Sequence, residues 1–231
     1  MMLWLRSALF LLWFALLTAI LALIFLPVLI LPRAATVWLA RLWARTTFWG
    51  LKIFAQIDFE IRGTPPKGAV LVAAKHMSMW DTLALYLALD EPAIVLKREL
   101  LRIPFYGWFV WKATAIAIDR AAGPRALRKM AADAKAVLAG NRPILIFPEG
   151  TRKKPGAAPN YKPGVAGLYA QLGVACVPVA LNSGVYWTGL LKRPGIIVLQ
   201  FLEPIPPGLK REPFMALLQT RIETATTALL P

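Results

Sequence analysis

The chain has 231 residues, of which 58% are hydrophobic; 27 are lysine or arginine and 12 are acidic, giving a formal charge of +15. This length suits one catalytic domain with an appendage, and so apolar a composition predicts that part of the chain meets lipid. One histidine and one cysteine allow no intrachain disulfide and cannot supply the ligands of a zinc site. The basic excess suits anionic lipids, acidic substrates or nucleic acid, and charge alone does not choose among them.

The N-terminal segment is the first predicted element. Residues 7–31 are 25 positions without a charge, which as a helix would reach about 37 Å, enough to cross a hydrocarbon layer of roughly 30 Å. A cleaved signal peptide usually has an apolar core of only about 7–15 residues, so the segment is expected to remain as an anchor.

A second stretch, residues 36–51, mixes tryptophan and arginine at helical spacing. This composition is typical of an interfacial helix, although a core-facing helix would also fit. Basic residues after the apolar segment place the rest of the chain on the cytoplasmic face of a bacterial-type inner membrane, by the positive-inside rule. Whether the first segment spans the membrane or forms a shallow hairpin with the second stays open. Residues 1–52 are therefore predicted to be the membrane anchor, and residues 53–231 the catalytic domain.

From residue 53 onward, apolar runs of strand length alternate with helical patterns. This alternation predicts an α/β fold, a mixed sheet flanked by helices. Strands are expected at 54–61, 69–74, 93–96, 115–118, 144–147, 176–181 and 196–202, and helices at 82–88, 106–112, 124–139, 165–172 and 213–229.

His76 follows one of the predicted strands and has Asp81 five residues later. On one continuous helix the two would lie on different faces, so they can pair only if His76 is on the loop and Asp81 in the first helical turn. Ser78 at the N-cap with Asp81 at N3 would give that geometry. Asp81 could then simply cap the helix, or it could orient His76 as a general base that activates a substrate hydroxyl.

A second candidate site follows the strand at 144–147. Glu149, Gly150, Thr151 and Arg152 lie on the loop where ligands bind in open α/β sheets, and arginine can hold a phosphate through two hydrogen bonds. Glu149 could pair with Arg152, hold it in position or accept a hydrogen bond from a substrate hydroxyl. Basic residues elsewhere include Lys97 at a strand end and Lys162; solvated surface is the expectation for Lys153, Lys154 and Arg211.

In order along the chain, four blocks resemble the 1-acyl-sn-glycerol-3-phosphate acyltransferase (lysophosphatidate acyltransferase) family. They are His76 to Asp81, residues 97–108 with 118–120, residues 147–152 with 161–164, and residues 177–180. The resemblance covers about residues 54–207 and implies a glycerolphosphate acyltransferase-like fold. One departure is Thr114, where many members have glycine.

The resemblance also implies roles for particular residues. His76 would be the general base and Asp81 its partner, in a transfer from acyl-CoA or acyl carrier protein to the sn-2 hydroxyl of lysophosphatidate. No covalent enzyme intermediate, metal or bound cofactor is implied. The acceptor would be bound by Lys97, Arg120, Glu149, Gly150, Thr151, Arg152 and Lys162.

Two rival functions remain open at this level. The acceptor could be another lysolipid, such as a lyso-ornithine lipid or lysophosphatidylglycerol. Alternatively, the chain could be a basic, non-enzymatic protein that binds membranes or nucleic acid. Because the sequence carries no recognised nucleic-acid motif, the prediction is an enzyme that meets anionic lipids and acyl thioesters and binds no nucleic acid.

Overall fold

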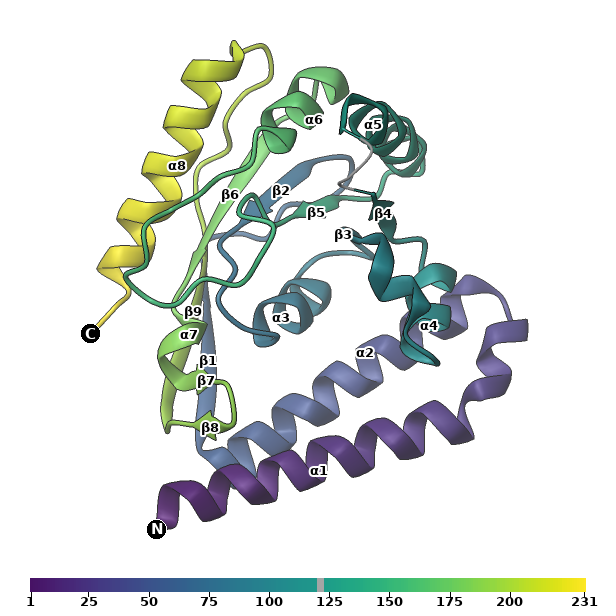
Figure 1. Ribbon diagram of the computed structural model, residues 1–231, viewed down its shortest axis with the longest axis vertical. Coiled ribbons are helices and arrows are strands. Elements are labelled where there is room, and N and C mark those ends of the chain that lie inside the picture. The colour runs from purple at the N-terminus through teal and green to yellow at the C-terminus, as the bar shows by residue number, and fades with distance from the viewer. Residues whose placement is uncertain (120–122) are drawn as a thin grey trace.

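The computed structural model describes residues 1–119 and 123–231. Its centre is a seven-stranded sheet in the order β1-β9-β6-β2-β5-β3-β4 (Figure 1). The strands are β1 Ile57–Arg62, β2 Leu71–Ala74, β3 Ala93–Lys97, β4 Ile116–Ile118, β5 Ile144–Ile146, β6 Cys176–Leu181 and β9 Gly195–Phe201. All neighbours pair in parallel except β6 and β9, so the predicted mixed sheet is confirmed.

Helices cover both faces of this sheet. On one face lie α5 (Gly123–Ala139), α6 (Gly164–Leu172) and α8 (Arg211–Ala228), around a core in which the ring of Tyr169 stacks on Phe214 with centroids 3.8 Å apart. On the other face α3 (Trp80–Ala88) packs between the sheet and the N-terminal helices. The central strands β2 and β5 are buried along their whole length, as continuous apolar runs in a parallel sheet require.

The N-terminal segment folds as a helical pair beneath the domain. Helix α1 (Met2–Ile24) is followed by a 3-10 turn at Leu26–Ile30, where Pro27 ends the regular helix, and by α2 (Arg33–Gly50). In the described parts of the chain, α1 is the one helix long and apolar enough to cross a membrane. It runs along α2 (Figure 1), and the indole N–H of Trp43 donates to the hydroxyl of Thr18 at 3.0 Å.

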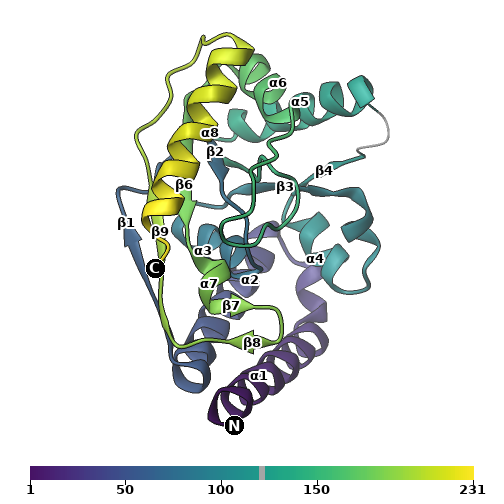
Figure 2. The same ribbon diagram turned by 60° about the vertical axis from the view of Figure 1, so that its left-hand side comes forward.

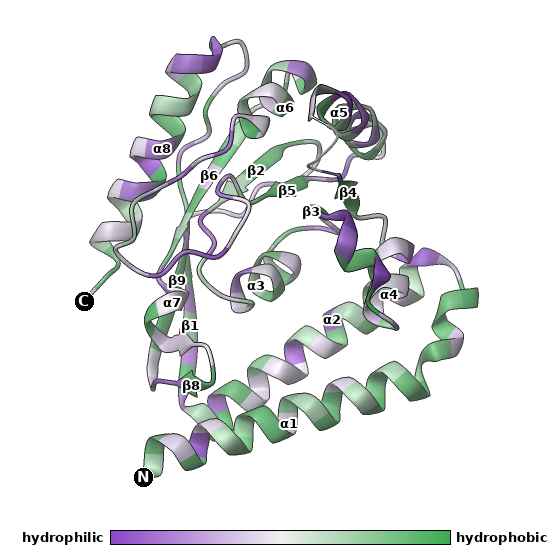
Figure 3. Ribbon diagram, in the orientation of Figure 1, coloured by the Kyte–Doolittle hydropathy of each residue, from purple (hydrophilic) through white to green (hydrophobic). Residues whose placement is uncertain are grey.

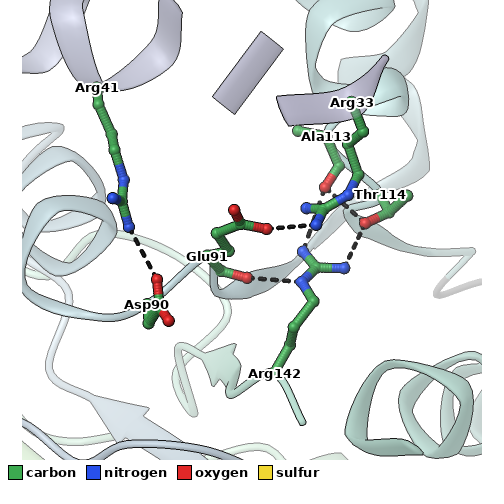
Figure 4. Close-up of polar contacts among 7 residues, drawn as sticks. All are labelled: Arg33, Arg41, Asp90, Glu91, Ala113, Thr114 and Arg142. Carbon is green, nitrogen blue, oxygen red and sulfur yellow. Dashed lines mark hydrogen bonds and ion pairs between the residues drawn. The ribbon is translucent and has the colours of Figure 1, made fainter. Parts of the chain in front are cut away.

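Ion pairs fix α2 to the α/β domain near the start and middle of the helix (Figure 4). Arg33 pairs with Glu91, and Arg41 with Asp90 at 3.2 Å. Arg142 donates to the carbonyl of Glu91 at 2.9 Å, so the loop between α3 and β3 receives contacts from both α2 and the α5–β5 connection. The second N-terminal stretch thus packs on the domain with one of its faces.

The elements agree with prediction apart from their ends and three additions. The first strand begins at Ile57 rather than 54, because residues 51–55 form a π-helical turn closed by Gln56 in the left-handed conformation. Helix α8 begins two residues before the expected 213, and α4 (Tyr106–Lys112) matches prediction. Short elements that the pattern did not predict are a 3-10 turn at Arg98–Arg102, α7 (Ser183–Tyr186) and the hairpin of β7 (Trp187–Thr188) and β8 (Leu191–Lys192).

Candidate active site

Four neighbouring parallel strands, β2, β5, β3 and β4, end at one edge of the sheet. His76 lies just past the end of β2, the turn with Arg152 follows β5, and Lys97 is the last residue of β3. Arg120, which follows β4, lies outside the described residues. The sheet topology therefore places residues from separate blocks of the sequence at one ligand-binding edge.

Asp81 holds the imidazole of His76 in one orientation. Nδ1 of His76 lies 3.0 Å from Oδ2 of Asp81, which also accepts the backbone N–H groups of Met77 at 2.6 Å and Ser78 at 2.9 Å. Oδ1 accepts the hydroxyls of Ser78 and Ser183, and the carboxylate is fully buried. Because an ionised carboxylate only accepts hydrogen bonds, Nδ1 carries the proton and Nε2 keeps its lone pair.

The same carboxylate also organises the start of α3. The prediction of Ser78 as N-cap is wrong by one residue, because the helix begins at Trp80 with Met79 as its N-cap. The hydroxyl of Ser78 nevertheless accepts the amide of Trp80 at 3.2 Å. Capping and orientation of His76 were alternatives in the sequence; Asp81 contacts His76 and reaches back to the amide of Ser78, whereas the N-cap of α3 has no side-chain hydrogen bond.

The loop after β5 is packed directly against His76. The ring of Phe147 stacks on the imidazole with centroids 3.9 Å apart and planes 20° apart. The amide of Lys153 donates to the carbonyl of His76 at 2.8 Å, and that of Lys162 to the carbonyl of Pro148 at 2.8 Å. The two motif loops and the segment before α6 are therefore joined through their backbones.

A cavity of about 1550 Å³ lies over this edge. His76 and Arg152 both line it, together with Lys97, Gly150, Thr151 and Lys162. Most of the other residues in its wall are apolar, among them Phe14 of α1, Trp43 of α2, Leu83 of α3 and Phe109 of α4. Pockets for drug-sized ligands are usually 300–1,000 Å³, so this cavity has room for a longer, largely apolar ligand with an anionic end.

Glu149 lies apart from its neighbours in the motif. Its side chain is 1% exposed, it is not among the residues that line the cavity, and its ion-pair partner is Lys75 at 3.1 Å rather than Arg152. Burial raises the pKa of Glu149. Of the roles considered for Glu149, the structure supports a buried structural ion pair, with a different cation from the one expected.

Two polar residues near the site, Lys75 and Ser183, were missed by sequence reasoning. Lys75 is 2% exposed and also pairs with Glu223 of α8 at 2.8 Å, while Ser183 is fully buried against Asp81. The signal for Lys75 was its place at the end of a wholly apolar strand, and for Ser183 its place just after β6. Arg211, expected as solvated surface, is exposed but also lines the cavity.

Thr114, where many family members have glycine, has a φ of +61°. This left-handed conformation is unfavourable for a β-branched residue and free for glycine. The guanidinium of Arg142 donates to the Thr114 hydroxyl at 2.6 Å (Figure 4). The departure from the family pattern is therefore accompanied by a hydrogen bond that glycine could not make.

Among residues 1–119 and 123–231, no group of three or more His, Cys, Asp or Glu side chains is placed to hold a metal ion. Cys176 is buried, and its burial raises the pKa of the thiol to about 12. This environment is that of an inert, structural cysteine.

Comparison with known proteins identifies the family of the chain. The sequence profile of the family described as Acyltransferase matches residues 56–182. A 1-acyl-sn-glycerol-3-phosphate acyltransferase of Pseudomonas aeruginosa is 36% identical over 173 residues, covering 73% of this chain and 67% of the relative. This chain therefore belongs to the acyltransferase family and is an O-acyltransferase.

Two further relatives bear on the fold and on specificity. The crystal structure of the 1-acyl-sn-glycerophosphate (LPA) acyltransferase PlsC from Thermotoga maritima matches with a TM-score of 0.79 at 21% identity, covering 97% of this chain and 96% of that one. This match confirms the fold. A lyso-ornithine lipid O-acyltransferase of Pseudomonas aeruginosa is 31% identical over 189 residues and 72% of each chain. Relatives with two different acceptors thus match this chain.

Proposed function

We propose that this enzyme transfers an acyl chain from a thioester to the sn-2 hydroxyl of 1-acyl-glycerol-3-phosphate, giving phosphatidate. The observation that carries the proposal is that His76 and Arg152 open into one cavity whose remaining wall is largely apolar. A lysolipid has the matching shape: a hydroxyl next to a phosphate, with a long acyl chain beyond them.

His76 acts as the general base. Because Asp81 fixes Nδ1 as the protonated nitrogen, Nε2 takes the proton of the acceptor hydroxyl as its oxygen attacks the thioester carbonyl. The carbon–sulfur bond then breaks, and the imidazolium returns the proton to the leaving thiolate. The atoms balance without a covalent enzyme intermediate or a cofactor.

The phosphate of the acceptor is bound by the basic groups of the cavity. Arg152 offers a fork of N–H donors and Lys97 and Lys162 add point charges, while Gly150 and Thr151 form the turn beside them. Arg120 is retained as a candidate from the family resemblance alone. Glu149 would contribute to acceptor binding through the turn rather than by contact.

The N-terminal helices attach the enzyme to the membrane surface. Contacts with the domain occur near both ends of the pair: the hydroxyl of Ser7 accepts the amide of Lys192 at 2.9 Å, and Arg33 pairs with Glu91. The middle of α1 lines the cavity. A helix that left the domain to cross a bilayer could not keep contacts along its length, so this arrangement favours the shallow hairpin over a span.

Helix α1 is apolar along most of its length (Figure 3), and the outward surface of the helical pair exposes many large hydrophobic side chains. Exposed large hydrophobic residues of this surface are Trp4, Leu5, Leu9, Leu12, Leu16, Ile20, Leu23, Ile24, Ile30, Leu31, Trp38 and Trp49. Soluble monomers rarely expose so large a contiguous apolar surface. We assign this surface to lipid, with the cavity opening toward the layer that supplies the lysolipid; the basic excess would attract anionic lipids.

The acceptor and donor classes have alternatives. A lyso-ornithine lipid is the second candidate acceptor, because a relative named for that reaction matches 72% of this chain. Both acyl-CoA and acyl carrier protein are candidate donors. An assay of purified enzyme with lysophosphatidate, lyso-ornithine lipid and both donor types decides among them.

His76→Ala tests the chemistry. General-base catalysis typically contributes 10²–10⁴-fold, so we expect kcat to fall by at least about a hundredfold, with thermal unfolding and membrane binding unchanged. Thioester consumption with lysophosphatidate is the measurement. Turnover near that of the wild type in a folded His76→Ala protein would refute the assigned base.

A further inference from the structure

A buried lysine directly beside His76 has no part in the proposed reaction. Lys75 follows β2, its side chain is 2% exposed, and it is not among the residues that line the cavity. An ammonium group is costly to bury unless anions and hydrogen bonds surround it. Such a group next to the candidate base calls for a role other than contact with substrate.

The ammonium of Lys75 gathers groups from distant parts of the chain. It donates to Oε1 of Glu149 at 3.1 Å and to both carboxylate oxygens of Glu223, at 2.8 and 3.0 Å. The hydroxyl of Tyr161 donates to Oε1 of Glu223 at 2.8 Å. We refer to Lys75, Glu149, Tyr161 and Glu223 as the Lys75 cluster.

Three members of the Lys75 cluster are sequence neighbours of cavity residues. Lys75 precedes His76, Glu149 precedes the turn at 150–152, and Tyr161 precedes Lys162. Glu223 lies on α8, away from the cavity wall. One buried cation therefore connects the segments that present the base and the anion-binding side chains.

We propose that Lys75 is a positioning residue for the acceptor: by holding Glu149 it sets the turn that carries Arg152 at a fixed place relative to His76. The inference rests on the proposed function, because it assumes that Arg152 binds the acceptor's phosphate. Without the ammonium, Glu149 becomes a buried carboxylate that has lost its ion-pair partner, and its Oε2 already lacks a hydrogen-bond partner among the described residues.

Either response of Glu149 would alter the turn. If Glu149 becomes protonated when Lys75 is lost, no new hydrogen bond replaces the one to the ammonium. If Glu149 instead rotates toward solvent, it displaces the backbone of Gly150, whose φ is +64°. Arg152 follows three residues after Glu149 in the same turn. The consequence is poorer binding of the phosphate and a hydroxyl held less well against Nε2 of His76, with the thioester site less affected.

Lys75→Met is the first test, with Lys129→Met as its control. Lys129 forms an exposed ion pair with Asp133 on α5, so its loss removes a lysine of equal charge without touching the cluster. We expect Lys75→Met to raise the acceptor's KM by about tenfold or more and to lower kcat by a similar factor, while the thioester's KM stays within about twofold. Lys129→Met should match the wild type.

Glu223→Ala provides a second test if Lys75→Met does not fold. Glu223 is 23% exposed and removing it leaves the Lys75–Glu149 pair intact, so folding should tolerate the change. The expected effect has the same sign and is smaller, about threefold or more in the acceptor's KM. Glu212→Ala, an exposed acid at the start of the same helix, is the matched control.

All variants are assayed in parallel with lysophosphatidate and lyso-ornithine lipid, and each is compared with the wild type on whichever acceptor turns over. If the wild type does not acylate lysophosphatidate, the proposed acceptor is overturned. The ratio of the acceptor's KM between variant and wild type, measured with the lipid that is acylated, still reports on Lys75. The positioning role is overturned if folded Lys75→Met or Glu223→Ala keeps the acceptor's KM, or if the KM of the thioester rises equally.

Discussion

At the scale of single residues, the site depends on fixing groups that would otherwise be mobile. Asp81 is buried among backbone and hydroxyl donors, so it can hold His76 in one tautomer and one orientation. Phe147 covers one face of the same ring. If His76 is the base proposed above, it is preorganised before an acceptor arrives, which lowers the cost of reaching the transition state.

Arg152→Ala should separate the two substrates of the reaction. If Arg152 binds the acceptor's phosphate, its loss should raise the acceptor's KM by about ten- to a hundredfold, since charge-assisted hydrogen bonds contribute roughly 1.5–3 kcal/mol. The thioester's KM should change little. Initial-rate kinetics with each substrate varied gives both constants. Lys154→Ala, an exposed lysine of the same loop, is the control.

A larger effect of Arg152→Ala on the thioester than on the acceptor would reassign this guanidinium to the phosphates of the donor. The cavity geometry alone allows a second anion, because Lys97, Lys162 and Arg211 also line it.

At the scale of elements, the helical pair packs tightly against itself. Gly50, the last residue of α2, lies against the indole of Trp13, and an added Cβ would be 2.2 Å from the ring. Gly50 has helical dihedrals, so propensity alone would favour alanine by about 1 kcal/mol. Close packing rather than backbone conformation thus explains glycine at this position.

Gly50→Ala should consequently destabilise the protein, because a rigid indole packed by Trp49 and Phe54 has little room to move. Overpacking costs about 1–3 kcal/mol, which exceeds the gain in helix propensity. The free energy of unfolding in detergent is the measurement. Gly140→Ala, where the nearest atom would be 3.3 Å away, should have a smaller effect. Equal or greater stability of Gly50→Ala would contradict the packing.

The β7–β8 hairpin supports the start of α1 through Lys192, which is fully buried. Its ammonium lies 4.8 Å from the ring centroid of Trp187, and its amide donates to Ser7. Burial lowers the pKa of Lys192 from 10.5 to about 8. Between about pH 8 and pH 10.5 the unfolded chain therefore binds more protons than the folded one. The free energy of unfolding should consequently rise with pH across that window.

Lys192→Met tests this linkage. The free energy of unfolding of the variant should not show this rise with pH. Its difference from the wild type should therefore change by roughly 2–3 kcal/mol between pH 7.5 and 10.5. Chemical denaturation in detergent at several pH values measures it. Parallel curves for the two proteins would show that Lys192 does not titrate in this range.

At the scale of the whole molecule, one cavity is lined both by the helical pair and by the basic residues at the edge of the sheet. Figure 2 shows α1 and α2 on one side of the sheet and α5, α6 and α8 on the other. The same helices that offer an apolar surface outward also line the cavity inward. A lysolipid could thus exchange between membrane and site without crossing water.

Trp4→Cys distinguishes a shallow hairpin from a first helix that spans. Trp4, at the start of α1, is 61% exposed, while the natural Cys176 is buried and its raised thiol pKa keeps it unreactive. In sealed vesicles with the domain inside, an impermeant maleimide added outside should not label Trp4→Cys. Labelling there would place the start of α1 on the far face and show that the helix spans. Lys129→Cys, on the domain, should be labelled only after the vesicles are opened.

The sequence by itself determined the α/β alternation, the apolar N-terminal helix and the residues of the motifs, because these follow from local periodicity and from residue types next to strand ends. The pairing of His76 with Asp81 could also be predicted, since its members lie five residues apart. Strand order then brought Arg152 and Lys97 to the same edge, as the rule for parallel sheets requires.

Only the tertiary structure decided the direction and partners of the buried polar groups. Glu149 turns away from the cavity toward Lys75, which lies 74 positions earlier, and Lys75 reaches Glu223 across 148 positions. Such contacts depend on how distant segments pack, and no local pattern contains that information. The same holds for the cavity itself, because its wall is completed by helices from the opposite end of the chain.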